Sequence, residues 1–424
     1  MAIIKEGDCM YGLVLEGGGA KGSYHAGVYK AIEEMGIEIS AVAGSSIGAL
    51  NGAMIIQDDY QKCHDLWYDM SYSMVFDLSP EEIEKLRNLR LTKEDIVLLG
   101  SKAKQLILNR GIDIGPIKDL IDTYIDEDKI RSSNKDFGIV TVNLTGLKPV
   151  EIFIDDIPRG DLKKYLLASA YLPFFRFEKI DGDLYLDGGF YDNLPYQMLL
   201  DKGYKDLIIV RTHAPGVTKK IDLEGTNSIV ISPSDDIGRT YLYEAESARR
   251  NIRLGYLDGL KAFKGLAGEK YYIETEEDED FYLNYLLGIN EEQVRLIEKI
   301  FKLEKRPYRR SLLENIVPKI CDYLYIDKNS TYKDLIIQLL ERNALRYDIE
   351  RFKIYSFEEL AEKVGEKISL DKKSENREKM ELSTLNKIIE KLESLPIFNK
   401  DEILIAIGEI LFKDIGENHY QKNV

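Results

Sequence analysis

Apolar and polar positions along the first 235 residues follow the order expected of strands that alternate with helices. An apolar run at 11–16 (YGLVLE) predicts a buried strand, and apolar positions about three residues apart predict a helix over 22–35. A second apolar run at 39–43 leads into GSSIGALNGAMII (44–56), where small residues mark one side of another predicted helix. This order is typical of a parallel sheet covered by helices.

The rest of the chain divides into a helical insertion, further strands and a helical end. Residues 58–135 have mostly helical patterns, with Ser79, Pro80 and Glu82 at the spacing of a helix N-terminal cap. Strand patterns return at FGIVTVNL, VEIFI, LYLD, DLIIV and SIVIS, and the last of them ends at Ser232. We therefore expect an α/β domain over 1–235, with a helical insertion at about 58–135, and a mostly helical region of unknown role over 236–424.

Charge and cysteine content narrow the classes of function. The formal net charge of −16, from 58 Lys and Arg against 74 Asp and Glu, argues against nucleic-acid binding. Three cysteines without a CxxC pair give no disulfide framework and no metal site, and we expect no metal and no cofactor. The N-terminus has no signal-peptide pattern, and the apolar run at 41–56 is too short to span a membrane. These features predict a cytoplasmic protein whose membrane contact, if any, is peripheral; they do not indicate an oligomeric state.

The glycine-rich segment EGGGAKG, between the first strand and the first helix, predicts a site for negative charge. Gly17, Gly19 and Gly22 fit the dinucleotide pattern GxGxxG, but the second strand ends in Gly-Ser-Ser instead of the acidic residue that binds a ribose. Lys21 precedes Gly22, so the order differs from that of a Walker loop. What remains is a row of N–H groups at a helix N-terminus, which stabilise a phosphate or an oxyanion.

The segment GSSIG at 44–48 matches GxSxG between a strand and a helix, the context of a serine nucleophile. Gly44 and Gly48 leave room for the sharp turn that would expose Ser46. Among the four histidines, only His213, just after an apolar strand, is placed like a triad base, in the chain order Ser46, Asp187, His213.

A carboxylate offers a second way to activate the serine. Asp187 ends a predicted strand and is followed by Gly188 and Gly189, which leave its side chain space to approach another backbone. Direct pairing of serine and carboxylate requires that closeness. The residues alone leave both bases open.

Three motifs in this order, GGGxKG, GxSxG and DGG, resemble those of the patatin-like phospholipase family over about residues 10–235. The segment ASAYLPFFRF (168–177) is similar to the small-residue and proline segment of that family. The resemblance implies a three-layer α/β/α sandwich with a mainly parallel sheet, and a Ser–Asp dyad that hydrolyses acyl esters of lipids. In place of the family's usual Asp at the start of the glycine loop, this chain has Glu16.

Carried over by motif, the resemblance makes Ser46 the nucleophile and Asp187 the general base, which we then expect to be shielded from water. It places the oxyanion hole in the loop that contains Gly17, Gly18, Gly19, Lys21 and Gly22, with the backbone amides of Gly18 and Gly19 as the donors. The expected activity is that of a phospholipase A or lysophospholipase, acting on a phospholipid or lysophospholipid through an acyl-enzyme. The alternatives are an α/β-hydrolase-type esterase with a Ser46–Asp187–His213 triad and a non-catalytic scaffold that binds a lipid or nucleotide.

Two further groups of residues are open to more than one interpretation. The aromatic residues Trp67, Phe76, Phe174 and Phe175 fit either the core or an apolar surface near the site. The basic residues between 239 and 264 fit either a solvated helix face or contact with anionic head groups.

Overall fold

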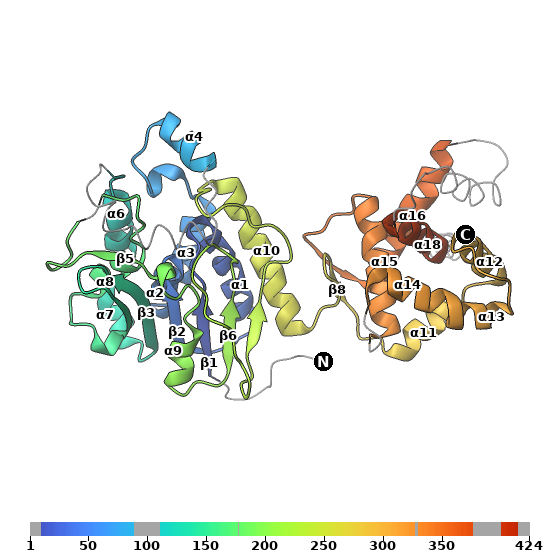
Figure 1. The fold of residues 1–424 in the computed structure, drawn as a ribbon, viewed down its shortest axis with the longest axis horizontal. Helices are drawn as coiled ribbons and strands as arrows, with labels where there is room; N and C mark the ends of the chain where they lie inside the picture. Colours follow the sequence, from blue (N-terminus) through green and yellow to red (C-terminus); the bar gives the residue numbers. More distant parts are fainter. Residues whose placement is uncertain (1–9, 89–110, 177, 327–329, 376–399, 414–424) are drawn as a thin grey trace. The chain divides into compact units, whose positions relative to one another are not determined.

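The computed structural model describes residues 10–88, 111–176, 178–326, 330–375 and 400–413 (Figure 1). The chain forms two compact units, Met1–Gly265 and Leu266–Val424, and each is described by itself. In the described residues, no helix is both long and apolar enough to cross a bilayer.

A mainly parallel sheet forms the centre of the first unit, in the order β4-β3-β2-β1-β6-β7. Its strands are β1 (Tyr11–Leu15), β2 (Ile39–Ser45), β3 (Asp136–Asn143), β4 (Lys148–Phe153), β5 (Tyr185–Asp187), β6 (Leu207–Val210) and β7 (Ile229–Ile231). All neighbours from β3 to β7 are parallel, whereas β4 and β5 both pair with β3 in antiparallel orientation. Every residue of β1 and β6 is buried, which explains their uninterrupted apolar sequences.

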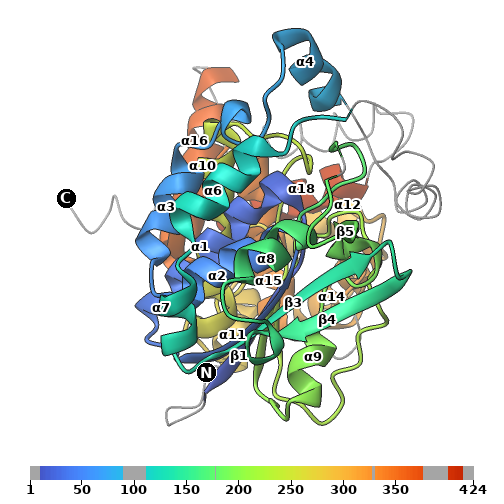
Figure 2. The same ribbon diagram turned by 90° about the vertical axis from the view of Figure 1, so that its left-hand side faces the viewer.

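Helices cover both faces of this sheet (Figure 2). The helices described in the first unit are α1 (Ser23–Glu34), α2 (Ile47–Ile56), α3 (Tyr60–Tyr68), α4 (Pro80–Asn88), α6 (Gly115–Tyr124), α7 (Glu127–Ser132), α8 (Leu162–Ser169), α9 (Tyr196–Asp201) and α10 (Ala245–Lys264), of which α4 projects away from the sheet. On one face, α2 lies so close that a Cβ on Gly52 would come within 2.8 Å of Val42. On the other face, Met198 and Leu199 of α9 pack with Val14. The predicted α/β/α layers are thus confirmed.

The last helix of this unit, α10, packs along α1 through glycines. A Cβ on Gly27 would lie 2.0 Å from the carbonyl oxygen of Ile252, and one on Gly255 would lie 2.3 Å from that of Tyr24. The Tyr24 hydroxyl also donates to the carboxylate of Asp258, at 2.9 Å. This contact places α10 in the first unit, so the two units divide after Gly265, whereas the sequence suggested a boundary at 235.

The segment expected to be a helical insertion, 58–135, contains α3, α4, α6 and α7; its residues 89–110 lie outside the described part. The predicted cap is present, since the Ser79 N–H donates to the Glu82 carboxylate at 2.9 Å.

The described residues of the second unit are mostly helical, as expected. Its elements are β8 (Tyr272–Glu274), α11 (Glu279–Leu287), α12 (Glu291–Ile300), α13 (Tyr308–Ser311), α14 (Val317–Leu324), α15 (Tyr332–Arg346), β9 (Ile354–Ser356), α16 (Phe357–Glu375) and α18 (Lys400–Phe412). A separate hydrophobic core joins the helices, and β8 pairs with β9 in parallel. The buried carboxylate of Glu341 accepts hydrogen bonds from the N–H groups of Glu269, Lys270 and Tyr271, which fixes the loop before β8.

Candidate active site

Ser46 occupies a strained turn between β2 and α2. Its backbone has φ 54° and ψ −125°, a conformation that residues with a side chain rarely adopt. A Cβ on Gly48 would lie 2.2 Å from the carbonyl oxygen of Leu15, and one on Gly44 would lie 2.4 Å from the carbonyl carbon of Gly48. Both glycines of GSSIG are therefore required by close backbone approach, as the motif predicts.

A neighbouring serine holds this turn in place. The Ser46 N–H donates to the hydroxyl of Ser169 at 2.9 Å, and that hydroxyl donates to the carbonyl of Val140 at 2.7 Å. Ser169 is fully buried at the end of α8. Sequence reasoning marked this small-residue segment but assigned no role to Ser169, because the role depends on a hydrogen bond across 123 residues.

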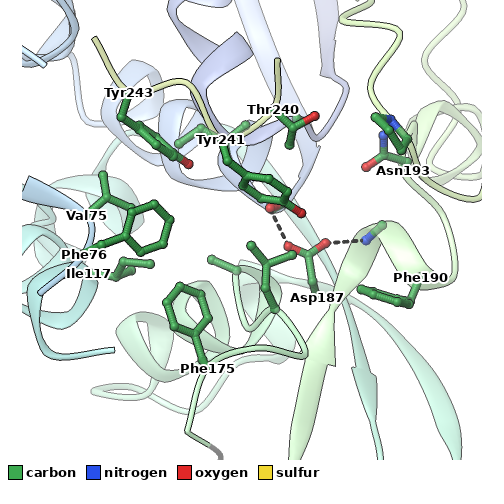
Figure 3. A pocket seen from close by; sticks show the side chains of 18 residues that line it. Val75, Phe76, Ile117, Phe175, Asp187, Phe190, Asn193, Thr240, Tyr241 and Tyr243 are labelled. Atoms are coloured by element: carbon green, nitrogen blue, oxygen red, sulfur yellow. Dashed lines mark hydrogen bonds between the residues drawn. The ribbon is translucent and has the colours of Figure 1, made fainter. Parts of the chain in front are cut away.

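Strand pairing brings Asp187 to Ser46. Ser45, at the end of β2, pairs with Val140 of β3, and Asp187, at the end of β5, pairs with the next residue, Thr141. Because β2 is parallel and β5 antiparallel to β3, their C-terminal ends meet on one edge of β3. Asp187 thereby accepts a hydrogen bond from the Ser46 hydroxyl, with 2.5 Å between Oγ and Oδ2 (Figure 3).

The residues after Asp187 complete its surroundings. The Gly189 N–H donates to the other carboxylate oxygen at 2.7 Å. A Cβ on Gly188 would lie 2.2 Å from the Val140 carbonyl oxygen, so this position accepts only glycine without a backbone shift. The DGG sequence thus provides both a hydrogen-bond donor and the room for close approach.

Burial dominates the electrostatics of Asp187, whose side chain is only 4% exposed. Removal from water raises its pKa from 3.8 to about 6, and the hydrogen bonds from Ser46 and Gly189 oppose that shift. The carboxylate is thus shielded from water, as expected, and its pKa lies near neutrality. A carboxylate with such a pKa is a stronger base than an ordinary exposed aspartate.

The glycine loop contributes two of its five predicted residues to the cavity. Gly18 and Gly19 line it, and in the described part of the chain no hydrogen bond engages their N–H groups. The Gly17 N–H instead donates to the carbonyl of Asn193, and the Lys21 ammonium donates to that of Thr212. Gly17 and Lys21 therefore lie outside the cavity wall.

Gly22, the last glycine of the loop, has a packing role. A Cβ there would lie 2.6 Å from Ile47 and 2.8 Å from the Trp67 ring. Like Gly17 and Lys21, it does not line the cavity, which limits the candidate oxyanion hole to Gly18 and Gly19.

Glu16 anchors the glycine loop to the segment after β6. Its buried carboxylate accepts from the Arg211 guanidinium at 3.1 Å and from the N–H groups of Thr212 and His213 at 2.6 and 2.9 Å. The Thr212 hydroxyl donates to the carbonyl of Gly17 at 2.7 Å. The longer Glu16, in place of the usual Asp, is therefore fully used as an anchor.

His213 does not join Ser46 and Asp187. Its side chain is exposed and does not line the cavity, and its backbone N–H is held by Glu16. His25 is buried beside Asn51, and burial lowers its pKa to about 3, so it is neutral. The structure thus brings together the pair that the Ser–Asp interpretation requires and not the triad.

The cavity above Ser46 and Asp187 has a volume of about 620 Å³, including its mouth. Its walls are largely apolar and come from Val75, Phe76, Ile117, Phe175 and Phe190 (Figure 3). Phe76 and Phe175, which the sequence left open between core and site, serve both, since they are buried and stack at 6.0 Å between ring centres.

Two tyrosines after β7, Tyr241 and Tyr243, line the cavity and were missed by sequence reasoning. Tyr241 lies beside the Asp187 carboxylate (Figure 3). Burial, and after it the charge of Asp187, raises the pKa of the Tyr241 phenol, and the same two causes raise the pKa of Tyr243. Both phenols therefore stay protonated. The pattern TYLYE gives no signal for this role, because it depends on contacts with residues far away in the chain.

The basic residues near α10 are engaged in part by the protein itself. Arg249 donates to the carbonyl of Tyr68 and pairs with Asp69, and Arg250 pairs with Asp235. These two charges fit the interpretation as a solvated helix face.

Comparison with known proteins gives a consistent family. The sequence model of a family described as patatin-like phospholipase matches residues 13–200. Patatin-like phospholipase domain-containing protein 6 of Homo sapiens is 30% identical over 203 residues, which are 47% of this chain and 13% of that protein. Lysophospholipase NTE1 of Cryptococcus neoformans var. neoformans is 30% identical over 205 residues, which are 47% of this chain and 11% of that protein.

The matched region is a small part of these long relatives, 13% or less of their length. Among solved structures, VipD from Legionella pneumophila aligns with 95% of this chain and 91% of its own, at 14% identity and a TM-score of 0.38. Residues 13–200, which contain both Ser46 and Asp187, form a patatin-like phospholipase domain.

Proposed function

We propose that this protein is a lipid acyl hydrolase of the phospholipase A or lysophospholipase type, with Ser46 and Asp187 as a catalytic dyad. The observation that carries the proposal is the 2.5 Å hydrogen bond from the Ser46 hydroxyl to a buried carboxylate, at the base of an apolar cavity. The family of residues 13–200 and the name of one relative, lysophospholipase, support the same substrate class.

In the proposed mechanism, Asp187 Oδ2 takes the proton of the Ser46 hydroxyl as Oγ attacks the ester carbonyl. The tetrahedral oxyanion accepts hydrogen bonds from the N–H groups of Gly18 and Gly19. The C–O bond to the leaving alcohol then breaks, and this alcohol takes the proton from Asp187. Water, deprotonated by Asp187, attacks the acyl-enzyme, and the fatty acid leaves as Ser46 regains its proton.

Each group has an expected share in the rate. A single oxyanion donor contributes about 10²- to 10³-fold, and general-base catalysis about 10²- to 10⁴-fold. The raised pKa of Asp187 favours the second contribution, because proton transfer from a hydroxyl is easier to a base with pKa about 6 than to one with pKa 3.8.

A lipid panel tests the proposal. Phospholipids and lysophospholipids of several head groups are incubated with the wild type, Ser46→Ala, Asp187→Asn and His213→Ala, and released fatty acid is measured. We expect loss of activity in the first two variants and retention in His213→Ala. A large loss in His213→Ala would instead favour the triad esterase.

A covalent probe provides an independent test of the nucleophile. A fluorophosphonate should label the wild type and not Ser46→Ala. Absence of labelling, together with absence of fatty-acid release from every lipid, would favour a non-catalytic scaffold and refute the proposal.

A further inference from the structure

A second cavity lies next to the one that contains Ser46. It has a volume of about 590 Å³, including the space at its mouth that is open to solvent, and lies among α2, α3 and α6. Its lining is almost entirely apolar and includes Met54 and Leu50 of α2, Leu66 and Trp67 of α3, and Leu120 of α6. Apolar cavities of this kind take up hydrocarbon in preference to water.

The two cavities share a wall. Ile47, Val75, Ile117 and Tyr243 line both of them, and Ile47 directly follows Ser46 in the chain. The second cavity is therefore lined by the residue that directly follows the candidate nucleophile. These four side chains thus lie where the two cavities adjoin.

Two polar side chains at the second cavity, Asn51 and Trp67, are hydrogen-bonded within the protein. Asn51 accepts from the Trp67 indole N–H at 3.0 Å and donates to the carbonyl of Gly22 at 2.9 Å. Gly22 allows the Trp67 ring to approach the glycine loop, since a Cβ there would lie 2.8 Å from the ring. With Asn51 and Trp67 paired to each other, the cavity wall favours an apolar ligand over a polar one.

We propose that this second cavity binds the distal part of the substrate's acyl chain, and that Ile47, Val75, Ile117 and Tyr243 form the constriction through which the chain passes. The inference rests on the proposed function, because an acyl ester must lie at Ser46. It assigns the substrate class more closely: the protein acts on long-chain acyl esters, and the space among α2, α3 and α6 sets the preferred length.

Chain-length dependence of hydrolysis is the first measurement. Each methylene buried in the cavity should raise kcat/KM about four-fold until the space is full. Monomeric p-nitrophenyl esters from C4 to C16 are compared in the wild type and in Leu66→Phe/Leu120→Phe. We expect the C12 to C4 ratio of kcat/KM to fall at least ten-fold in the double variant, because its larger side chains occupy the cavity.

Leu200→Phe is the matched control, since Leu200 is also a half-buried helix leucine but packs on the other face of the sheet. It should keep the wild-type ratio. Circular dichroism and thermal unfolding of all three proteins check that they are folded; if the double variant is not, the two single variants replace it. An unchanged ratio in folded variants would overturn the inference.

Trp67 allows a second measurement that needs no hydrolysis, because it is the only tryptophan of the chain and lines the cavity. Bromine quenches tryptophan fluorescence on contact, so 16-bromohexadecanoic acid should quench Trp67 strongly. The isomer with bromine at carbon 2, near the carboxylate, should quench it little. Equal quenching by both acids, or none by either, would refute binding of the distal chain.

The two measurements separate this inference from the proposed function. Quenching by the far-end bromine without hydrolysis of any ester supports the chain site and refutes the hydrolase. Hydrolysis with an unchanged length ratio and no selective quenching supports the hydrolase and refutes the chain site.

Discussion

Asp187→Asn should stabilise the first unit at alkaline pH, and the size of the effect follows from the burial of the carboxylate. The folded protein raises the pKa of Asp187 from 3.8 to about 6. A difference of about 2 pKa units corresponds to about 3 kcal/mol between the protonation states. This is the free energy of unfolding that the ionised carboxylate removes and a neutral amide of the same shape restores.

The sign follows from proton binding. Between pH 3.8 and about 6, the folded protein binds the proton of Asp187 more tightly than the unfolded chain does, so stability falls as pH rises through this window. Above it the full cost of about 3 kcal/mol is present, whereas below pH 3.8 both states are protonated and the cost disappears. Asp187→Asn should therefore gain about 3 kcal/mol at pH 8 and almost nothing at pH 3.5.

Urea unfolding followed by Trp67 fluorescence measures this difference. Trp67 is the sole tryptophan and lies in the same unit as Asp187, so its signal reports the unit of interest. Asp155→Asn, which removes an exposed carboxylate, controls for the loss of one charge. A stability difference that does not change with pH, or a variant that is less stable than the wild type at pH 8, would refute the assigned burial cost.

Three further predictions follow from the same geometry. The wild-type kcat/KM should fall about ten-fold per pH unit below about pH 6, because only ionised Asp187 accepts the serine proton; a flat profile from pH 4.5 to 6 in steady-state assays would contradict this. Gly188→Ala should lower kcat at least about 100-fold, since its Cβ would lie 2.2 Å from a β3 carbonyl oxygen. Gly146→Ala, whose Cβ would meet its nearest atom at 3.4 Å, should leave kcat near wild type in the same assay. Ser169→Ala removes the acceptor of the Ser46 N–H and should cost about 1–3 kcal/mol of stability, measured by thermal unfolding, together with a lower kcat.

Local sequence was sufficient for the parts of the fold that backbone geometry dictates. The strand, turn and helix around Ser46 were predictable because Gly44 and Gly48 are required by close backbone contacts. The approach of Asp187 was predictable as one of two alternatives, since Gly188 and Gly189 mark the same kind of crowding. His213 could be set aside only when its exposed side chain was seen outside the cavity.

Other parts depend on contacts that no local pattern encodes. The apolar pattern of α10 predicts a helix, but it does not predict which unit of the protein the helix packs on. The close contact between Gly27 of α1 and Ile252 of α10 shows that it packs on the first unit. Tyr241 and Tyr243, in the segment just before α10, line the cavity, and no local pattern marks them for that position. The role of Glu16 as an anchor could not be predicted from the sequence either, because it depends on N–H groups nearly 200 residues away.

The meeting of β2 and β5 on one edge of β3 makes the distance between Ser46 and Asp187 a property of sheet register. The two residues are 141 positions apart in the chain, but Ser45, next to Ser46, and Asp187 pair with adjacent residues of β3, Val140 and Thr141. Loops and helices between them can therefore lengthen or change without moving the two groups apart. A slip of β5 by a single residue, in contrast, would turn the carboxylate to the opposite face of the sheet. The pairing of β5 with three residues of β3, Asn143, Val142 and Thr141, thus determines where the Asp187 carboxylate lies relative to Ser46.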